Sequence, residues 1–448
     1  MELLGLFGLL VFFGVIIASL KEWIPQDVLP VQSALILTTL FLVVIAALFG
    51  QPINLKELSA NIYIHPITAL LAGFLVAGAL EAAGAFKAAI DILERLAETP
   101  LGLPGTVVIL VNMPTIFAMP CGRILAAALI PAALLFGYEL ARVRETPLLV
   151  SVVIFGFIVN AAASCGPSPL GGIGTMGEGM GGYDIGSLAN AQQVGIMVIT
   201  AVAMVSIKLI YRILPGETII EEMMEENEQK KKKDNNKVPA SGYFSFFFFL
   251  IGIAVVFITK PPVPIQTILV FFVIVIMLIS RVSIQDLIGG VILHPVMAMI
   301  SGFIIAGALI AIGSFDALIE LLSIAAEMEL LPGMALGYVG VAVILANTPS
   351  ILPMPCGRIM AAALMPGVLL FGLKVSEATG NALATPILLT GFILNAAASC
   401  GPSPLGGIGG IGEGNLGTAI GISGKPQQVG IMMGTGIAVL IIGLLGFI

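Results

Sequence analysis

The feature that most constrains this chain is a stretch of fifteen residues that occurs twice. NAAASCGPSPLGGIG occupies residues 160–174 and returns unchanged at residues 395–409, which is 235 positions later (395 − 160). A second stretch, NMPTIFAMPCGRILAAALIPAALLFG at 112–137, returns at the same offset as NTPSILPMPCGRIMAAALMPGVLLFG at 347–372. Two long repeats at one offset predict two halves with the same structure, as in many secondary transporters.

Both repeated stretches lie between long apolar runs. The chain has 448 residues, of which 58% are hydrophobic and only 10% charged. Soluble domains carry about 25% charged residues, so this composition predicts a multi-pass protein of the cell membrane. No dense basic surface is apparent outside one short lysine run, which argues against a nucleic-acid partner.

Each half is expected to contain five membrane spans, one helical hairpin interrupted by prolines, and one break rich in glycine. Apolar runs of about twenty residues match the hydrocarbon thickness. In the first half the expected spans are 3–20, 31–50, 66–86, 147–163 and 190–211, with the hairpin at 104–137 and the break at 164–186. In the second half they are 243–259, 263–280, 294–313, 383–399 and 427–447, with the hairpin at 332–372 and the break at 400–418.

The charges predict that the halves have opposite orientations. Residues 1–215 and 243–448 form the two repeats, and the strongly charged segment 216–242 between them, which includes Lys230 to Lys233, is expected to be a cytoplasmic linker. Five spans per half is an odd number, so the second repeat is expected to be inverted, with both chain ends outside. The loop expected after the third span agrees with this prediction. It carries Lys87 and Arg95 in the first half, whereas its second-half counterpart carries Asp316, Glu320, Glu327 and Glu329.

The repeated stretches combine interrupted backbone with polar side chains. Backbone groups freed by glycine or proline are tolerated at membrane depth only where protein or a wet cavity surrounds them. The freed backbone carbonyls and the side-chain oxygens of Asn, Thr and Ser could bind a hard cation, and helix N-termini beyond the breaks could face an anion. Alternatively, the polar side chains simply cap the broken helices. The candidate binding residues are Asn112, Thr115, Asn160, Ser164 and Ser168, with Asn347, Ser350, Asn395, Ser399 and Ser403 as their counterparts.

Four charged residues also fall within or beside the repeats, namely Arg123, Glu178, Arg358 and Glu413. Ionisable groups at membrane depth are costly and are usually paired or functional. Three interpretations remain open. Each Arg could neutralise the Glu of its own repeat, each Arg could bind an anionic substrate, or each Glu could carry a coupling ion or proton.

This pattern resembles the ion transporter superfamily, which includes sodium–dicarboxylate symporters and citrate and arsenite permeases. Within it, the twin PMPCGR and NAAASCGPSPLGGIG blocks are most similar to a group of archaeal and bacterial proteins thought to transport cations. The family's hairpin tip typically reads Ser-Asn-Thr. Asn112 with Thr115 and Asn347 with Ser350 match its amide and hydroxyl, whereas Val111 and Ala346 replace the leading serine.

The resemblance implies an all-α membrane protein made of two inverted-topology repeats, each with a re-entrant hairpin and an unwound helix. It also implies a homodimer, and Na⁺ bound at Asn112, Thr115, Asn347 and Ser350. We expect no cofactor apart from Na⁺ as a possible coupling ion.

The function expected from these observations is ion-coupled secondary transport by alternating access, of a cation with Na⁺ or H⁺ coupling. A Na⁺-coupled symporter of a small organic or inorganic anion is the near alternative. A channel with a Gly-rich GGIG filter is a weaker one. We expect no enzymatic activity, although Cys121 or Cys356 could serve an intramembrane enzyme. The four cysteines, Cys121, Cys165, Cys356 and Cys400, could also form a soft-metal site, but small buried packing residues explain them more simply.

Overall fold

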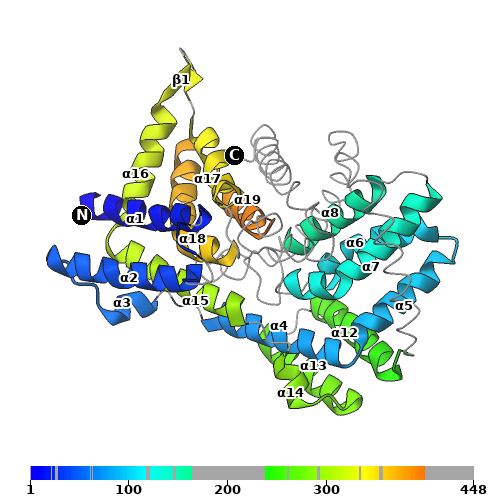
Figure 1. Cartoon of the computed structure of the whole chain (residues 1–448). Helices are drawn as coiled ribbons and strands as arrows, with labels where there is room; N and C mark the ends of the chain where they lie inside the picture. The colour runs from blue at the N-terminus through cyan, green and yellow to red at the C-terminus, as the bar shows by residue number, and fades with distance from the viewer. Residues whose placement is uncertain are drawn as a thin grey trace.

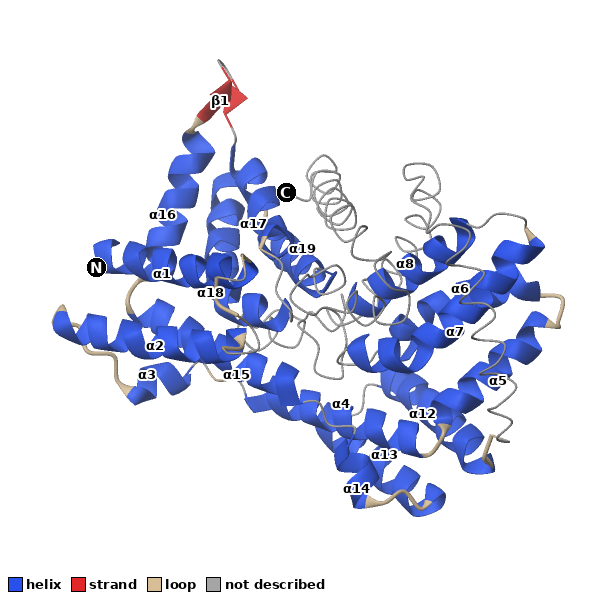
Figure 2. Ribbon diagram, viewed as in Figure 1, coloured by secondary structure: helices blue, strands red, loops and turns tan. Residues whose placement is uncertain are grey.

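The structure is a computed structural model of the whole chain. It describes residues 2–21, 23–25, 29–60, 62, 64–117, 122–144, 148–163, 238–259, 262–289, 293–331, 334–335, 337–352 and 357–398. These parts are almost entirely helical, as the composition predicts for a membrane protein (Figure 2). Within them, β1 (Glu329–Leu331) and β2 (Met334–Ala335) form a small antiparallel hairpin.

The described helices of the first half recur in the same order in the second half. The first half contains α1 (Glu2–Leu20), α2 (Val31–Leu48), α3 (Leu55–Ala60), α4 (Ile64–Ala82), α5 (Ala85–Ala97), α6 (Gly102–Phe117), α7 (Gly122–Val143) and α8 (Leu148–Ala163). The second contains α12 (Ala240–Thr259), α13 (Ile265–Ser280), α14 (Ile284–Gly289), α15 (Leu293–Ala311), α16 (Ser314–Glu327), α17 (Gly337–Ile351), α18 (Gly357–Thr379) and α19 (Ala384–Ala398).

Eight of the ten expected spans coincide with helices, namely α1, α2, α4, α8, α12, α13, α15 and α19. The two hairpin segments contain two helices each, α6 with α7 and α17 with α18, and the members of each pair are in contact. The other two spans, 190–211 and 427–447, lie outside the described residues, as do both breaks and most of the linker.

The loops expected after the third spans are helices instead. The bends are 64° between α4 and α5 and 76° between α15 and α16. Gly84 and Gly313 begin α5 and α16 with φ of +80° and +73°, a left-handed conformation that glycine adopts without strain. In α5, Phe86, Ala89 and Leu93 recur at helical spacing and are buried. The charged residues of this segment therefore occupy the outer face of an amphipathic helix.

Two short helices, α3 and α14, were also not expected. Each begins with side chains that cap the first turn. The Glu57 amide donates to Asn54 Oδ1 at 2.9 Å, and the Asp286 amide donates to Ser283 Oγ at 3.1 Å. A polar residue followed three positions later by an acid is a capping signal that the sequence does contain.

The two halves are intertwined rather than side by side. The first three helices of each half pack with the later helices of the other half. Figure 1 therefore shows two lobes of mixed origin, α1–α3 with α15–α19 and α12–α14 with α4–α8. The lobes meet where α4 contacts α15 and where α8 contacts α19, so equivalent helices pair with each other at the centre.

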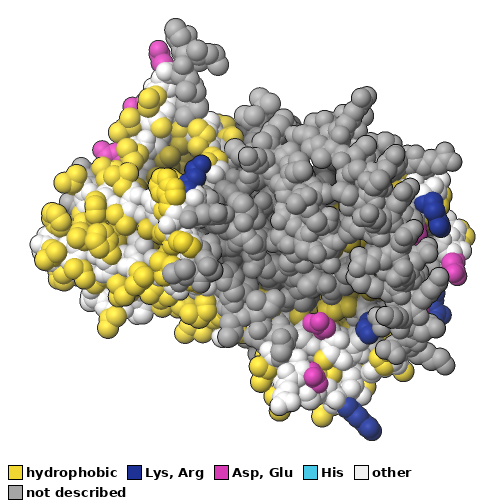
Figure 3. Space-filling view, in the orientation of Figure 1, with side chains coloured by type: hydrophobic (Ala, Val, Ile, Leu, Met, Phe, Trp, Pro, Cys, Tyr) yellow, Lys and Arg dark blue, Asp and Glu magenta, His cyan; other side chains and the backbone are white. Residues whose placement is uncertain are grey.

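The outer surface carries many large apolar side chains. They belong chiefly to α1, α2, α12 and α13, and Figure 3 shows them over the α1–α2 side of the molecule. Such extensive apolar exposure is typical of a surface that faces lipid. Among the described helices, α2 and the Ile359–Thr379 part of α18 are long and apolar enough to cross a membrane, or up to four spans if each bent pair counts as one. These are features of a membrane protein.

Candidate functional site: two linked asparagine pairs

Helix α6 is interrupted near its end by Pro114. Proline has no N–H, so the carbonyl of Leu110 loses its helical donor there. The next amide, that of Thr115, donates to Asn160 Oδ1 of α8 at 3.1 Å. The proline thus opens the final turn of α6 to a partner from another helix.

Asn160 ties α6 to α8 with three hydrogen bonds. Its Oδ1 also accepts from Thr115 Oγ1 at 2.8 Å, and its Nδ2 donates to Asn112 Oδ1 at 3.1 Å. Asn112 in turn donates through Nδ2 to the carbonyl of Val108, one turn earlier, at 2.9 Å. All three polar side chains are buried, so each bond forms in a poorly hydrated environment where an unmade one is costly.

The second half repeats this arrangement. Asn395 of α19 donates through Nδ2 to Asn347 Oδ1 of α17 at 3.0 Å, and Asn347 donates to the carbonyl of Val343 at 2.8 Å. Pro349 interrupts α17 at the position that Pro114 has in α6. Both asparagines are buried. The two asparagine pairs therefore have the same partners and nearly the same distances.

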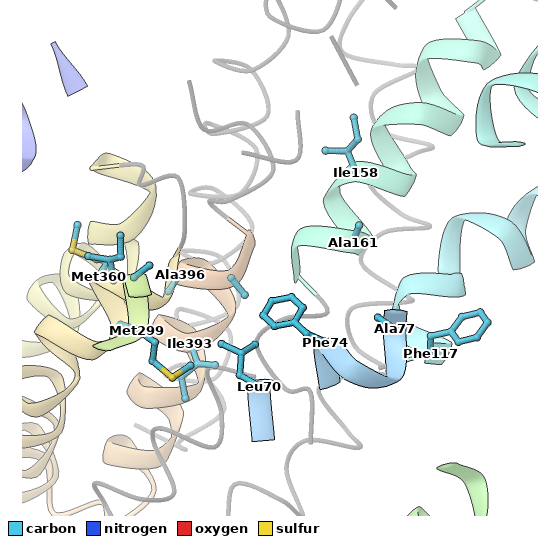
Figure 4. Packing of buried hydrophobic residues seen from close by; sticks show 14 of the residues in the cluster. Leu70, Phe74, Ala77, Phe117, Ile158, Ala161, Met299, Met360, Ile393 and Ala396 are labelled. Atoms are coloured by element: carbon cyan, nitrogen blue, oxygen red, sulfur yellow. The ribbon is translucent and has the colours of Figure 1, made fainter. Parts of the chain in front are cut away.

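Both pairs lie near helix C-termini and flank the contact between α8 and α19. Asn160 and Asn395 are three residues from the last residues of α8 and α19, Ala163 and Ala398. Figure 4 shows Ala161 of α8 and Ile393 of α19 on either side of Phe74 from α4, in the buried centre of the molecule. Helix C-termini present carbonyl oxygens and a partial negative charge, which favour a cation.

The described part of the site is electrically neutral. Among the residues whose burial the structure describes, no Asp, Glu, Lys or Arg is buried, whereas Asn, Thr and Ser are. Amide, hydroxyl and carbonyl oxygens with helix C-termini can stabilise a small monovalent cation without a full countercharge. The chemistry available in these residues is ion coordination.

The structure thus brings together Asn112, Thr115 and Asn160, and separately Asn347 and Asn395. Ser350 lies in α17, and Arg123 and Arg358 are the second residues of α7 and α18, but the side chains of these three are outside the described part. The remaining predicted residues lie outside the described ranges altogether, namely Ser164, Ser168, Glu178, Ser399, Ser403, Glu413 and the four cysteines.

One polar cluster, between α5 and α12, was not predicted from the sequence. Tyr243 Oη donates to Asp91 Oδ2 at 2.6 Å, and Arg95 Nε donates to the same oxygen at 2.8 Å. Asp91 and Arg95 have the spacing of an ion pair within a helix, which could have been found once this segment was recognised as helical. The contribution of Tyr243 comes from the other half of the chain and has no local signal.

A comparison of the chain with protein-family models and with curated proteins finds no match.

Proposed function

We propose that this protein is an ion-coupled secondary active transporter that works by alternating access and carries a cation with Na⁺ or H⁺ coupling. It would be a multi-pass protein of the cell membrane. The observation that carries the proposal is the pair of equivalent Asn–Asn bonds, Asn112 with Asn160 and Asn347 with Asn395, each made beside a proline-interrupted helix. Duplicated, interrupted helices around a central site are characteristic of secondary transporters.

The cation preference is supported by the kinds of atoms and helix ends at the two pairs. Helices α6, α8, α17 and α19 all end within a few residues of the asparagines. Their C-terminal carbonyls, with those of Leu110 and Leu345 that the prolines leave without a helical donor, are oxygen ligands of the kind that Na⁺ accepts. The proposed Na⁺ ligands are Asn112 and Thr115 in one half and Asn347 and Ser350 in the other.

The opposite orientation of the halves is part of the proposal. The feature that supports it is the difference in charge between the equivalent helices α5 and α16. Most major helix contacts also recur with the halves exchanged, apart from the packing of α15 on α18. The basic residues of α5 and the lysine run of the linker would lie on the cytoplasmic side, and the acidic α16 would lie outside. The resemblance to the ion transporter superfamily further suggests a homodimer.

An anion symporter is the second candidate. It is favoured by the positions of Arg123 and Arg358, which are the second residues of α7 and α18. A guanidinium at a helix N-terminus adds to a partial positive charge, and both would attract a carboxylate or an oxyanion. This candidate predicts flux that depends on the two arginines.

The test is flux into proteoliposomes, with Na⁺, H⁺ and solute gradients imposed one at a time. A coupled transporter should give saturable uptake driven by one ion gradient. Asn112→Ala and Asn347→Ala should each reduce the flux by at least about tenfold, because each removes a proposed ligand and one hydrogen bond to a buried asparagine. Arg123→Gln and Arg358→Gln distinguish the anion symporter, which would lose uptake in those variants.

Asn54→Ala is the matched control, since Asn54 is an exposed cap of α3 outside the site. It should leave the flux unchanged. Single-channel currents without saturation would instead establish a channel. Unchanged flux and ion dependence in both Asn112→Ala and Asn347→Ala would overturn the assignment of the site.

A further inference from the structure

The halves are joined at two equivalent crossings, which we call the first and second joints. At the first joint, α12 crosses the bend between α4 and α5. At the second joint, α1 crosses the bend between α15 and α16. At each joint, two glycines face each other closely. A Cβ added at Gly242 would lie 2.6 Å from the carbonyl oxygen of Gly84, and one added at Gly5 would lie 2.5 Å from that of Gly313. The backbone crossing is therefore common to both joints.

The side chains at the two joints differ. At the first joint, Tyr243 and Arg95 both donate to Asp91, which links α12 to α5. Leu6 follows Gly5 as Tyr243 follows Gly242, and Ile324 follows Gly313 by the interval that separates Arg95 from Gly84. Because leucine and isoleucine have no polar atoms, the second joint cannot form this network.

The aromatic packing is also more extensive at the first joint. Phe117, the last residue of α6, lies at the first joint among three other rings. Its ring centroid is 6.3 Å from that of Phe86 in α5, 5.7 Å from Phe246 and 5.9 Å from Phe249 in α12. Edge-to-face and stacked rings at these separations stabilise beyond the area they bury. The end of the first hairpin helix is thus anchored to a helix of the other half.

Among the described residues, the second hairpin helix ends without the aromatic residue that anchors the first, although Phe315 and Phe12 stand at the positions of Phe86 and Phe249. Leu352 occupies the position equivalent to Phe117, 235 residues later (352 − 117), and Leu9 occupies the position equivalent to Phe246. Helix α17 ends one residue earlier than α6, at Ile351, because Pro353 disfavours helical backbone at the residue before it. Phe117 is completely packed, whereas Leu352 is only partly buried.

We propose that the two hairpin helices are mechanically unequal: α6 stays fixed to α12 through Phe117 and the Tyr243–Asp91–Arg95 cluster, and α17 is the one that loosens. If the protein is the transporter proposed above, the conformational change that opens the central site begins at α17. The mechanical inequality itself does not depend on any transported substrate.

Hydrogen–deuterium exchange of the purified protein in lipid nanodiscs tests the inequality without a transport assay. The amides of 102–117 should exchange about tenfold more slowly than those of 337–351, since local opening of α6 must break contacts that α17 lacks. Equal rates, or slower exchange in 337–351, would overturn the proposal. Transport could fail while this difference stands, so the two proposals are separable.

Substituting Phe117 by the residue found at the equivalent position of the second half sharpens the test. Phe117→Leu should speed exchange in 102–117 towards the rate of 337–351 and leave the latter unchanged, and Phe244→Leu is its control. Phe244 belongs to the same aromatic run of α12, but its ring stacks on Phe248 and not on Phe117. Should Phe117→Leu fail to fold, Tyr243→Phe provides the same readout with a smaller packing change. Exchange in 102–117 that stays as slow as before in every folded variant would also contradict the proposal.

Discussion

The centre of the molecule and the joints at its sides are both duplicated, but the side-chain contacts are repeated more completely at the centre. At the centre, the Asn112–Asn160 and Asn347–Asn395 bonds are nearly equal in length, with donor–acceptor distances of 3.1 and 3.0 Å. At the joints, the glycine crossing and two of the phenylalanines are repeated, but Leu6, Ile324 and Leu352 replace Tyr243, Arg95 and Phe117. The repeated sequence therefore fixes the same chemistry twice at the centre. At the joints, it repeats the close approach of two backbones but not the polar cluster or the ring that ends α6.

The strongest test of the shared part of the joints is to add a methyl group at either crossing. Gly5→Ala and Gly242→Ala should each lower the free energy of unfolding by about 3 kcal/mol, because the new Cβ meets backbone that cannot rotate away. Equilibrium unfolding in mixed detergent micelles measures the effect.

Gly14→Ala in the same helix as Gly5 is the control, since nothing lies within 4 Å of the point that its new methyl group would occupy. It should be neutral or slightly stabilising, as alanine is the better helix former. A large effect at one joint and none at the other would show that the crossings are not equivalent.

The equality of the two asparagine pairs can be tested by substitutions that lower the free energy of unfolding by a smaller amount. Asn160→Ala and Asn395→Ala should each cost about 2 kcal/mol, since each leaves a buried amide partner unsatisfied. Double-mutant cycles on 112 with 160 and on 347 with 395 should give the same coupling, about 1 kcal/mol, from the same unfolding measurement. Coupling in only one half would break the comparison at the centre.

The smallest expected effect concerns the difference between the joints. Tyr243→Phe removes the hydroxyl that donates to Asp91 and keeps the ring. We expect it to lower the unfolding midpoint by less than about half the amount that Gly242→Ala does. The side chain of Asp91 is 27% exposed and that of Arg95 is 73% exposed, and water screens such a pair. Leu6→Phe is the matched change at the second joint and should show no loss of a polar contact. A shift for Tyr243→Phe no larger than that of this control would remove the polar cluster as a distinction between the joints.

Most of the helices could be predicted from the sequence, because an apolar run bounded by proline, glycine or charge has few alternatives to a membrane helix. The exceptions are instructive. Helices α5 and α16 carry many charged residues, so hydropathy alone predicts loops there. The spacing of Phe86, Ala89 and Leu93 in α5 indicates a helix instead. The β1–β2 hairpin, at the point where the second hairpin segment was expected to begin, had no clear signal in so short a segment.

The candidate site was predicted in part. The repeat singled out Asn112, Thr115, Asn160, Asn347 and Asn395, and the structure places the members of each half in hydrogen-bonding contact. The sequence did not indicate how the asparagines pair, because residues 48 positions apart are linked only by the packing of α6 on α8 and of α17 on α19.

Composition and the constant offset of the repeats were enough to predict a helical membrane protein with two equivalent halves, because both are read directly from the order of the residues. Only the packing of the folded helices shows that the halves exchange their first three helices, that α8 contacts α19, and that Tyr243 donates to Asp91. Those contacts join residues up to 309 positions apart, as between Ser314 and Gly5. Close approach of distant backbones depends on how the folded helices cross, which no pattern along the chain records.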